Sequence, residues 1–338
     1  MATVQETQNS HSSTTKNEHL PLVYYHRSPS FNFSINQWLE PSFRLLEPDH
    51  PEFSSLSQTV KALVVVGPTP LTGETLDKLP GVEIVVGTSA GVNHMDVAEC
   101  HRRGVKVTNA GDAFSEDVAD YAVGLLVDVL RRVSAADRFV RAGLWPLNGV
   151  YPLGSKALKS LEMQLGGKVI GIIGLGRIGS EIAKRLEAFG CVIAYNSRNK
   201  KPHVSYPYYA NVNDLAANSD VLIVCCALTK ETHHLINKDV MTALGKTGVV
   251  INVGRGALID EKELVKFLVR GEIGGAGLDV FQDEPRVPEE LIGLDNVVLS
   301  PHRAVATPES MVALRNVVIG NLSAFFADKP LLSQIMPE

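Results

Sequence analysis

The chain of 338 residues is long enough for about two domains, each with its own core. Its 45% hydrophobic and 20% charged residues are ordinary for a soluble protein, and a net charge of −5 gives no basic field, so neither nucleic acid nor a membrane is expected as a partner. The four cysteines form no C-x-x-C pair, which indicates reduced core residues of an intracellular protein rather than disulfides or metal ligands.

The N-terminal segment 1–19 is rich in Ser, Thr, Asn, Gln and His and contains neither an apolar run nor an arginine. This composition predicts a disordered tail rather than a signal or transit peptide. No run of about 18 apolar residues occurs in the chain, so no membrane span is expected. The last residues do not read Ser-Lys-Leu, the simplest peroxisomal signal. We therefore expect a cytoplasmic protein.

Strands and helices are expected to alternate in the first third of the chain. Apolar runs predict strands at residues 20–25, 61–67, 82–86 and 105–108. Helical segments are expected between them at residues 72–79 and 95–103. This alternation predicts a small α/β domain with a parallel sheet.

A longer periodic segment follows. From Asp117 to about Arg141, apolar residues recur at spacings of three and four, which predicts one long amphipathic helix. Such a helix could connect two domains, form half of a subunit interface, or simply pack on its own domain. Residues 142–167 contain repeated glycine and proline residues, so a loop or arm is expected there.

The second half of the chain is organised around a glycine-rich motif. The β-branched run 169–173 leads directly into Gly-x-Gly-x-x-Gly, and helical spacing begins at once. Gly174 and Gly176 allow a sharp turn and the close approach of a pyrophosphate to the helix N-terminus, and Gly179 lets the helix lie close to the strand. The apolar face of this helix is expected to comprise Ile178, Ile182, Leu186 and Phe189. The motif therefore predicts a dinucleotide site.

Further strands are expected after this motif, with helical segments between the earlier ones, notably 261–269. They are predicted at residues 191–195, 221–225, 249–253, 276–281 and 297–300. With 169–173 they match a doubly wound, mostly parallel sheet. A last helix is expected at about 307–326. Because the motif lies in mid-chain, a cofactor domain at 121–303 is expected to be inserted into a substrate domain of 20–120 plus 304–338, with the active site in the cleft between them.

The turn after the second strand of this sheet indicates the preferred dinucleotide. A protein that prefers NAD usually has an acidic residue about 20 residues after the glycine-rich loop, where it accepts hydrogen bonds from the ribose. Here the turn reads Asn-Ser-Arg-Asn at 196–199, and no acidic residue occurs between Glu187 and Asp214. Ser197 can hydrogen-bond a 2′-phosphate and Arg198 can clamp it. We therefore expect NADPH to be preferred over NADH, although the turn could also be a solvated surface feature.

Three polar residues lie where later strands are expected to end: Arg255, Glu284 and His302. Ligands of open α/β sheets bind beyond the carboxyl ends of the strands, so these side chains could converge. Reduction of a ketone by hydride needs a proton donor, which a histidine stabilised by a carboxylate can provide near neutral pH. Arginine can bind a carboxylate through two parallel hydrogen bonds. Taken singly, each of the three could equally be a surface or turn residue.

Several motifs, in this order, resemble those of the D-isomer-specific 2-hydroxyacid dehydrogenases. They are Gly-Leu-Gly-Arg-Ile-Gly at 174–179, Asn-Val-Gly-Arg-Gly at 252–256, Gly-Gly-Ala-Gly-Leu-Asp-Val-Phe at 274–281 with Glu284-Pro285, and Ser-Pro-His at 300–302. The similarity runs from about residue 20 to the end. Tyr-Asn-Ser-Arg at 195–198 and Val-Ala-Asp at 118–120 are typical of the plant hydroxypyruvate and hydroxyphenylpyruvate reductase branch.

The resemblance implies a fold and an activity. The fold would comprise two Rossmann-like domains with doubly wound, mostly parallel sheets, the cofactor domain being inserted into a flavodoxin-like substrate domain. The activity would be reduction of short 2-oxo acids, namely glyoxylate and hydroxypyruvate, with 4-hydroxyphenylpyruvate as the bulkier alternative. Members of the family are typically homodimers, which would use the long helix and the arm.

Two other interpretations stay open. One is a corepressor-like protein of the same fold that senses dinucleotides, although such proteins carry peptide-binding and regulatory extensions and this chain has only a short polar tail. The other is a dehydrogenase that works in the oxidative direction, for example on formate. Glu284 argues against it, because those relatives tend to have glutamine there.

The resemblance also implies roles for individual residues. Arg255 would bind substrate, His302 would be the acid/base and contact substrate, and Glu284 would orient and charge the histidine. The backbone N–H groups of Ser89, Ala90 and Gly91 would receive the substrate carboxylate. The residues expected to line the cofactor are Gly174, Leu175, Gly176, Arg177, Ile178, Gly179, Ser197, Arg198, Asn199, Val253, Gly254, Arg255 and Asp279, the last near the nicotinamide.

One stretch departs from the family pattern. After the histidine, where many relatives have a small or apolar residue and then Gly-Ser, this chain has Arg303, Ala304 and Val305. Ala304 and Val305 are expected to narrow the mouth of the site, and Arg303 could point toward substrate or toward solvent. The departure leaves the acceptable substrate side chain open.

Overall fold

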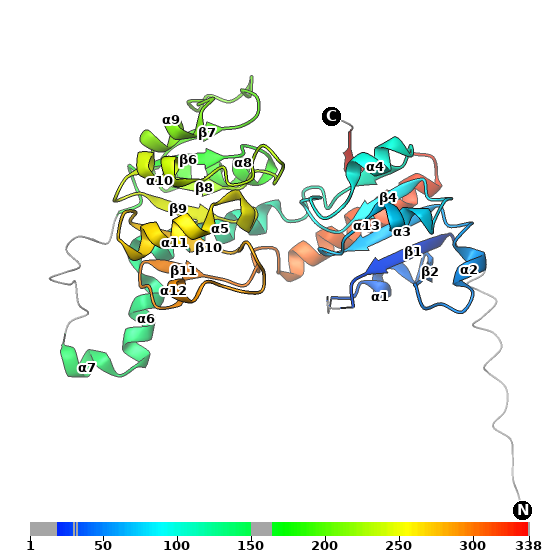
Figure 1. Ribbon diagram of the computed structural model, residues 1–338, viewed down its shortest axis with the longest axis horizontal. Coiled ribbons are helices and arrows are strands. Elements are labelled where there is room, and N and C mark those ends of the chain that lie inside the picture. Colours follow the sequence, from blue (N-terminus) through cyan, green and yellow to red (C-terminus); the bar gives the residue numbers. More distant parts are fainter. Residues whose placement is uncertain (1–18, 30, 32, 150–163, 337–338) are drawn as a thin grey trace, which may run out of the picture. The chain divides into compact units, whose positions relative to one another are not determined.

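The computed structural model describes residues 19–29, 31, 33–149 and 164–336, so the predicted tail lies outside the described residues apart from His19. The chain forms two compact units (Figure 1). The first comprises the residues up to Ala113 and those from Pro308 onward, and the second comprises Phe114–Thr307. The second unit is thus inserted into the first along the chain; it spans 114–307, where 121–303 was expected.

The first unit contains a six-stranded sheet in the order β12-β5-β4-β3-β1-β2. Neighbouring strands are parallel except for β12 and β5. The strands are β1 (Leu22–Arg27), β2 (Arg44–Leu46), β3 (Ala62–Val66), β4 (Ile84–Gly87), β5 (Lys106–Thr108) and β12 (Gln334–Ile335). Every residue of β3 is fully buried, because helices cover both faces of a parallel sheet. The four predicted strands are present, whereas β2 and β12 are too short for their sequences to indicate them.

The helices of the first unit are mostly short. They are α1 (Asn36–Leu39), α2 (Phe53–Leu56), α3 (Gly73–Asp77), α4 (Val97–Arg102) and α13 (Pro308–Phe326). The helices predicted at 72–79, 95–103 and 307–326 correspond to α3, α4 and α13. The C-terminal helix therefore belongs to the same unit as the N-terminal strands.

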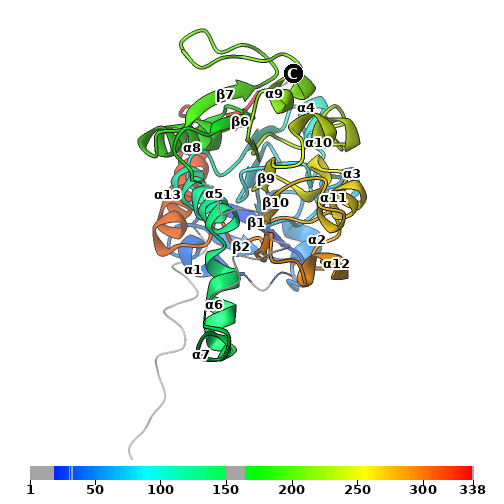
Figure 2. The ribbon, with the colours of Figure 1, turned by 90° about the vertical axis from the view of Figure 1, so that its left-hand side faces the viewer.

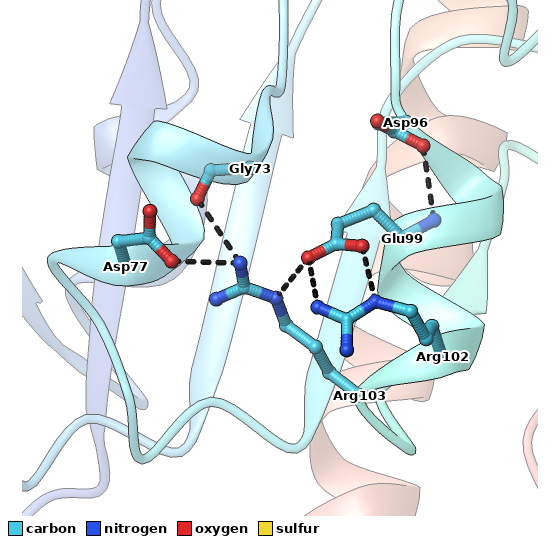
Figure 3. Close-up of polar contacts among 6 residues, drawn as sticks. All are labelled: Gly73, Asp77, Asp96, Glu99, Arg102 and Arg103. Atoms are coloured by element: carbon cyan, nitrogen blue, oxygen red, sulfur yellow. Dashed lines mark hydrogen bonds and ion pairs between the residues drawn. The ribbon is translucent and has the colours of Figure 1, made fainter.

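An ionic cluster joins α3 to α4 (Figure 3). Both Arg102 and Arg103 bond the carboxylate of Glu99, at 2.6 and 2.7 Å, and Arg103 also reaches the carboxylate of Asp77 at 2.7 Å. The hydrogen bonds and charges of the two arginines lower the pKa of Glu99 to about 2. Asp96 caps α4 by accepting a hydrogen bond from the N–H of Glu99 at 2.9 Å.

The second unit contains a parallel six-stranded sheet in the order β11-β10-β9-β8-β6-β7. Its strands are β6 (Val169–Ile173), β7 (Val192–Asn196), β8 (Val221–Val224), β9 (Val249–Asn252), β10 (Gly275–Leu278) and β11 (Val297–Leu299). All six were predicted, and the doubly wound fold is confirmed. The strand predicted at 276–281 ends earlier, at Leu278, because the backbone turns from Asp279 onward to form a loop.

Most helices of the second unit flank its sheet, whereas the last two before residue 150 extend away from it (Figures 1 and 2). The helices are α5 (Ser115–Arg131), α6 (Val133–Arg141), α7 (Leu144–Asn148), α8 (Arg177–Ala188), α9 (Val212–Ala217), α10 (Lys238–Leu244), α11 (Glu261–Val269) and α12 (Glu289–Ile292), with a 3₁₀ turn η2 (Gly256–Leu258). No helix in the described part of the chain is long and apolar enough to cross a membrane.

The four cysteines are free thiols, and burial raises the pKa of Cys100 and of Cys226 to about 11.

The prediction of a single helix from Asp117 to Arg141 is wrong, because the segment forms two helices, α5 and α6. Arg132 adopts a left-handed backbone with φ of 52°, which separates α5 from α6. The carboxylate of Asp128 accepts hydrogen bonds from the backbone N–H and the hydroxyl of Ser134, and so satisfies the first turn of α6. The region predicted as a loop contains α7 as well, while residues 150–163 lie outside the described part.

Candidate active site

The glycine-rich loop joins β6 to α8. Gly174 has a φ of 100°, and a Cβ there would lie 2.6 Å from the Cα of Cys226. A Cβ at Gly179 would lie 2.2 Å from the carbonyl oxygen of Gly174, so the first turn of α8 can approach the loop only with glycine there. At Gly176, by contrast, no atom lies within 4 Å of the Cβ position. The loop therefore leaves open space beside the first N–H groups of a 12-residue helix, an environment that suits a pyrophosphate.

The apolar face of α8 differs from the prediction at one end. Ile182 and Leu186 are fully buried, and Ile178 is half-buried. Phe189 is 50% exposed, because it follows the last residue of the helix and does not continue its face. Of the other loop residues expected to contact cofactor, Leu175 is buried and Arg177 is exposed.

The predicted 2′-phosphate turn follows β7. Asn196 pairs with Ile173, the last residue of β6, so this turn and the glycine-rich loop leave the same edge of the sheet. The hydroxyl of Ser197 donates to the carbonyl of Asn199 at 2.7 Å, which closes the turn and leaves Arg198 exposed. Asn196 is used structurally, because its side-chain amide donates to the carbonyl of Tyr209 at 2.8 Å.

An acidic residue that sequence reasoning missed lies close to this turn. The pKa of Glu231 is lowered, mainly by the hydroxyl of Thr229 and the backbone, with smaller contributions from the charges of Lys230 and Arg198. Glu231 therefore lies within electrostatic range of Arg198. It belongs to the loop after β8, the strand on the other side of β6, so no local sequence pattern could have placed it beside the turn.

The loop that carries Arg255 is shaped by a buried amide. Asn252 ends β9 and is 1% exposed. Its side-chain NH₂ donates to the carbonyl of Arg255 at 2.9 Å, and its side-chain oxygen accepts from the N–H of Gly254 at 3.1 Å. The guanidinium of Arg255 donates to the carbonyl of Gly254 at 2.7 Å. Burial lowers the pKa of Arg255, and the negative charge of Glu284 opposes that shift.

Glu284 and His302 form a hydrogen-bonded pair. Nδ1 of His302 lies 2.8 Å from Oε2 of Glu284, and the other carboxylate oxygen accepts from the N–H of Phe281 at 3.1 Å. Burial alone would raise the pKa of Glu284, but His302, the N–H of Phe281 and the charge of Arg255 outweigh it, so the pKa is lowered. The ionised carboxylate requires a donor at Nδ1, which leaves Nε2 for exchange of a proton.

The three predicted residues therefore come together within the second unit. Arg255 follows β9, Glu284 lies in the loop after β10, and His302 follows β11, so each is carried by the carboxyl end of a neighbouring strand. We call this group the strand-end trio. Its side chains are only partly exposed, with 39% for His302 and 36% for Glu284.

Asp279, expected near the nicotinamide, points its polar groups at the segment that carries His302. Ser300 Oγ and the N–H groups of Arg303 and Ala304 donate to its carboxylate, and the N–H of His302 donates to its carbonyl. Arg303 has an exposed side chain. Ala304 was expected at the mouth of the site but is only 4% exposed. Its N–H donates to the buried carboxylate of Asp279, which holds the residue below the surface.

A cavity of about 280 Å³ adjoins the histidine–carboxylate pair. Glu284 and His302 form part of its wall, and the rest is mainly apolar. The apolar part comprises Phe281, Pro285, Val287, Leu299 and Pro301. The cavity therefore offers room for an uncharged group beside the imidazole.

The loop expected to receive the substrate carboxylate belongs to the first unit, after β4. The hydroxyl of Ser89 donates to the carbonyl of Gly67 at 2.9 Å, and the side chain of Asn109 donates to the carbonyl of Ala90 at 2.9 Å. Within the described part of the chain, the N–H groups of Ala90 and Gly91 donate to no protein acceptor. The loop is thus held by its side chains and carbonyls, and its N–H groups remain suited to an anion.

Comparisons with known proteins agree with these features. Residues 123–304 match the model of the D-isomer-specific 2-hydroxyacid dehydrogenase NAD-binding domain. A glyoxylate/hydroxypyruvate reductase of Arabidopsis thaliana is 55% identical over 93% of this chain and 97% of its own length. A hydroxyphenylpyruvate reductase of Plectranthus scutellarioides is 46% identical over 89% of this chain and 95% of its own.

Solved structures give the same result. An NADPH-dependent glyoxylate/hydroxypyruvate reductase of Sinorhizobium meliloti, in complex with NADP and malonate, has a TM-score of 0.82 and 36% identity, covering 93% of this chain and 96% of that one. A 2-hydroxyacid dehydrogenase of Ketogulonicigenium vulgare has a TM-score of 0.81 and 30% identity, covering 94% and 98%. The chain belongs to the D-isomer-specific 2-hydroxyacid dehydrogenase family.

Proposed function

We propose that this protein is an NADPH-preferring reductase of short 2-oxo acids, with glyoxylate and hydroxypyruvate as its principal substrates. The observation that carries the proposal is the hydrogen-bonded pair of Glu284 and His302, with Arg255 in electrostatic contact with it, in the unit that contains the glycine-rich loop. The names of relatives with 55% and 36% identity support the same activity.

Each member of the strand-end trio has a proposed task. When bound, a reduced nicotinamide supplies the hydride that reaches the carbonyl carbon of the substrate. His302 gives the proton on Nε2 to the carbonyl oxygen as that oxygen gains negative charge, and Glu284 stabilises the imidazolium before transfer. Arg255 binds the substrate carboxylate and polarises the adjacent carbonyl. In the first unit, the N–H groups of Ser89–Gly91 are proposed to receive a substrate carboxylate.

The preference for NADPH is proposed from the turn after β7. Arg198 offers a guanidinium to a 2′-phosphate, and the turn contains no carboxylate to repel it. The hydroxyl of Ser197 would have to turn from the carbonyl of Asn199 to donate to the same phosphate. We expect Arg198→Ala to raise the Kd for NADPH by about tenfold or more and to change the Kd for NADH little, as suits the loss of a charged hydrogen bond. Equal losses for both nucleotides, measured by fluorescence titration, would remove Arg198 from this role.

Glu231 provides the matched control for that titration. Its negative charge lies within range of Arg198 and would oppose a 2′-phosphate bound there. Glu231→Gln should therefore lower the Kd for NADPH about two- to fivefold, the size of an exposed charge interaction, and leave NADH unaffected. A weaker affinity for NADPH in this variant would contradict the placement of the phosphate.

A homodimer is proposed through the segment α5–α7. Figure 2 shows α6 continuing beyond α5, with α7 at its far end. Val133, Val140, Trp145 and Leu147 on this segment are 50–78% exposed. Exposed apolar side chains gathered on one segment are typical of an interface. Analytical ultracentrifugation of Trp145→Asp tests this, with a monomer expected.

A cytoplasmic location is proposed from the free cysteines.

A second candidate function is reduction of 4-hydroxyphenylpyruvate. Two observations favour it: the relative with 46% identity, and the apolar cavity beside His302. Its volume of about 280 Å³ exceeds the roughly 150 Å³ in which a protein cavity can hold benzene. This cavity could take the aromatic ring of the bulkier substrate.

The deciding experiment is a panel of 2-oxo acids assayed with both reduced nucleotides. The proposal expects the highest kcat/KM with glyoxylate or hydroxypyruvate and NADPH. A highest value with 4-hydroxyphenylpyruvate would support the second candidate. Binding of NADPH without turnover of any 2-oxo acid would favour a dinucleotide-sensing protein of the corepressor kind instead.

A further inference from the structure

Asp279 is a buried carboxylate with an unusual set of partners. It follows the last residue of β10, and only 1% of it is exposed. One carboxylate oxygen accepts from the hydroxyl of Ser300 at 2.6 Å and from the N–H of Arg303 at 2.8 Å. The other accepts from the N–H of Ala304 at 3.0 Å. All three donors lie within five consecutive residues, 300–304, which include His302.

The main chain of Asp279 extends the same anchoring. Its carbonyl accepts the N–H of His302 at 2.8 Å, and its own N–H donates to the carbonyl of Asn252 at 3.0 Å. Asp279 is therefore fixed to the end of β9 on one side and holds the 300–304 segment on the other. Both its backbone and its side chain converge on one short loop.

The backbone of that loop needs such support. His302 has a φ of 53°, in the left-handed region that a residue with a side chain adopts at a cost. Removing a carboxylate from water is also unfavourable unless donors replace the lost hydration. The donors that replace the hydration of Asp279 all come from the segment that carries the left-handed residue, so these hydrogen bonds fix the conformation of that segment.

We infer that Asp279 is a positioning residue of the reductase, whose carboxylate holds His302 in the orientation that pairs Nδ1 with Glu284 and presents Nε2 to the substrate carbonyl. This inference rests on the proposed role of His302 as proton donor. Asp279 acts through the loop and exchanges no proton with the substrate. Ser300 belongs to the same device, because its hydroxyl occupies one carboxylate lone pair.

Replacement of Asp279 by asparagine distinguishes the positioning of His302 from a role in binding substrate or nucleotide. An amide has one oxygen, so Asp279→Asn must place its NH₂ group against at least one of the donors that now point at the carboxylate. We expect kcat to fall about 10- to 100-fold from the misplaced acid. The KM for hydroxypyruvate should change less than about threefold, because Arg255 remains in place. The Kd for NADPH should change less than kcat, because all four polar contacts of Asp279 with 300–304 are directed at the loop of His302 and not at the glycine-rich loop.

A double-mutant cycle with His302→Ala supplies the decisive readout. If Asp279 acts only through the imidazole, Asp279→Asn should change kcat by less than about twofold in the His302→Ala background. Asp283→Asn is the matched control: its carboxylate lies nearby in sequence, is 75% exposed and pairs only with Arg286 in the described structure. This control should retain wild-type kinetics.

The outcomes separate the inference from the function on which it rests. Wild-type turnover in His302→Ala would refute the proton-donor role and the positioning role together. A loss from Asp279→Asn that is equally large in both backgrounds, or a selective loss of NADPH affinity, would refute the positioning role alone.

Ser300→Ala is a second test of the positioning role, to be used if Asp279→Asn does not fold. It removes one donor and leaves both N–H contacts with the carboxylate. We expect a loss in kcat of about 3- to 10-fold, as for one hydrogen bond, again absent in the His302→Ala background. An unchanged kcat in Ser300→Ala would overturn the inference.

Discussion

Two carboxylates with lowered pKa values lie in different units and serve different ends. Glu99 is bonded by Arg102 and Arg103, three and four residues further along its own helix. Glu284 is bonded by His302, which lies 18 residues further along the chain, after β11. The two shifts are similar in kind, since hydrogen bonds from nitrogen atoms of nearby side chains stabilise each carboxylate. A shifted pKa therefore does not by itself identify a functional site.

The surroundings distinguish the two. The cluster around Glu99 fixes one short helix to another at the surface (Figure 3). The pair around Glu284 lies at the carboxyl ends of parallel strands, beside a cavity and near the half-buried Arg255. Position on the fold, rather than the strength of the ion pair, separates a stabilising contact from a candidate catalytic one.

The largest expected effect is on the pair of the second unit. His302→Ala should lower kcat by about a hundred- to ten-thousandfold, because it removes the proton donor. The Kd for NADPH should stay near the wild-type value. Steady-state kinetics with hydroxypyruvate and fluorescence titration of NADPH measure the two quantities. An unaltered rate would show that the pair of Glu284 and His302 is no more catalytic than the cluster around Glu99.

Arg255→Lys should follow in size. Lysine keeps a positive charge but lacks the planar pair of donors that a carboxylate accepts, so kcat/KM should fall about 10- to 100-fold. The same substitution at Arg103 provides the comparison: Arg103→Lys affects only the surface cluster and should leave kcat/KM unchanged. Near-wild-type constants for Arg255→Lys would exclude Arg255 from substrate binding.

A smaller effect is expected from the charge of Glu284. Its folded-state pKa is lowered, so its ion pair contributes stability above the unfolded-state pKa, and this contribution is lost as pH falls through the folded-state pKa. Glu284→Gln removes this titrating group and a charged partner of Nδ1 of His302. It should reduce the neutral rate about tenfold, the size of one hydrogen bond to a charged group, and should flatten the acid side of the profile of Tm against pH. A profile that keeps the wild-type shape would contradict this.

The smallest effect on activity is expected for Glu99. With a folded-state pKa of about 2, its contribution to stability is present above the ordinary pKa of glutamate and disappears as pH falls through about 2. Glu99→Gln should lower Tm at pH 7, and its difference from wild type should vanish near pH 2. Turnover should not change. A loss of activity that matches Glu284→Gln would remove the distinction between the two clusters.

The parts predicted well from sequence share a local origin. The six strands of the second sheet are apolar runs bounded by turns, and the dinucleotide loop is contained in residues 169–179. The errors have two sources. The helix break at Arg132 accompanies a short-range contact, between Asp128 and Ser134, that the apolar spacing does not reveal. The strand β12 depends on a distant partner, because it exists through its pairing with β5. Glu231, in the loop after another strand, lies within electrostatic range of Arg198 in the turn after β7.

The amino-acid sequence by itself determined the alternation of strands and helices, the glycines that only a tight strand–helix turn requires, and the identity of the three residues at the strand ends. These features depend on side-chain size and spacing within a few residues. Only the tertiary structure decided which atoms meet: Nδ1 of His302 with Glu284, and the carboxylate of Asp279 with the loop that carries His302. Those contacts depend on the pairing of β9, β10 and β11, and hydrogen bonds between residues 18 to 25 apart in the chain follow from that pairing rather than from any local pattern.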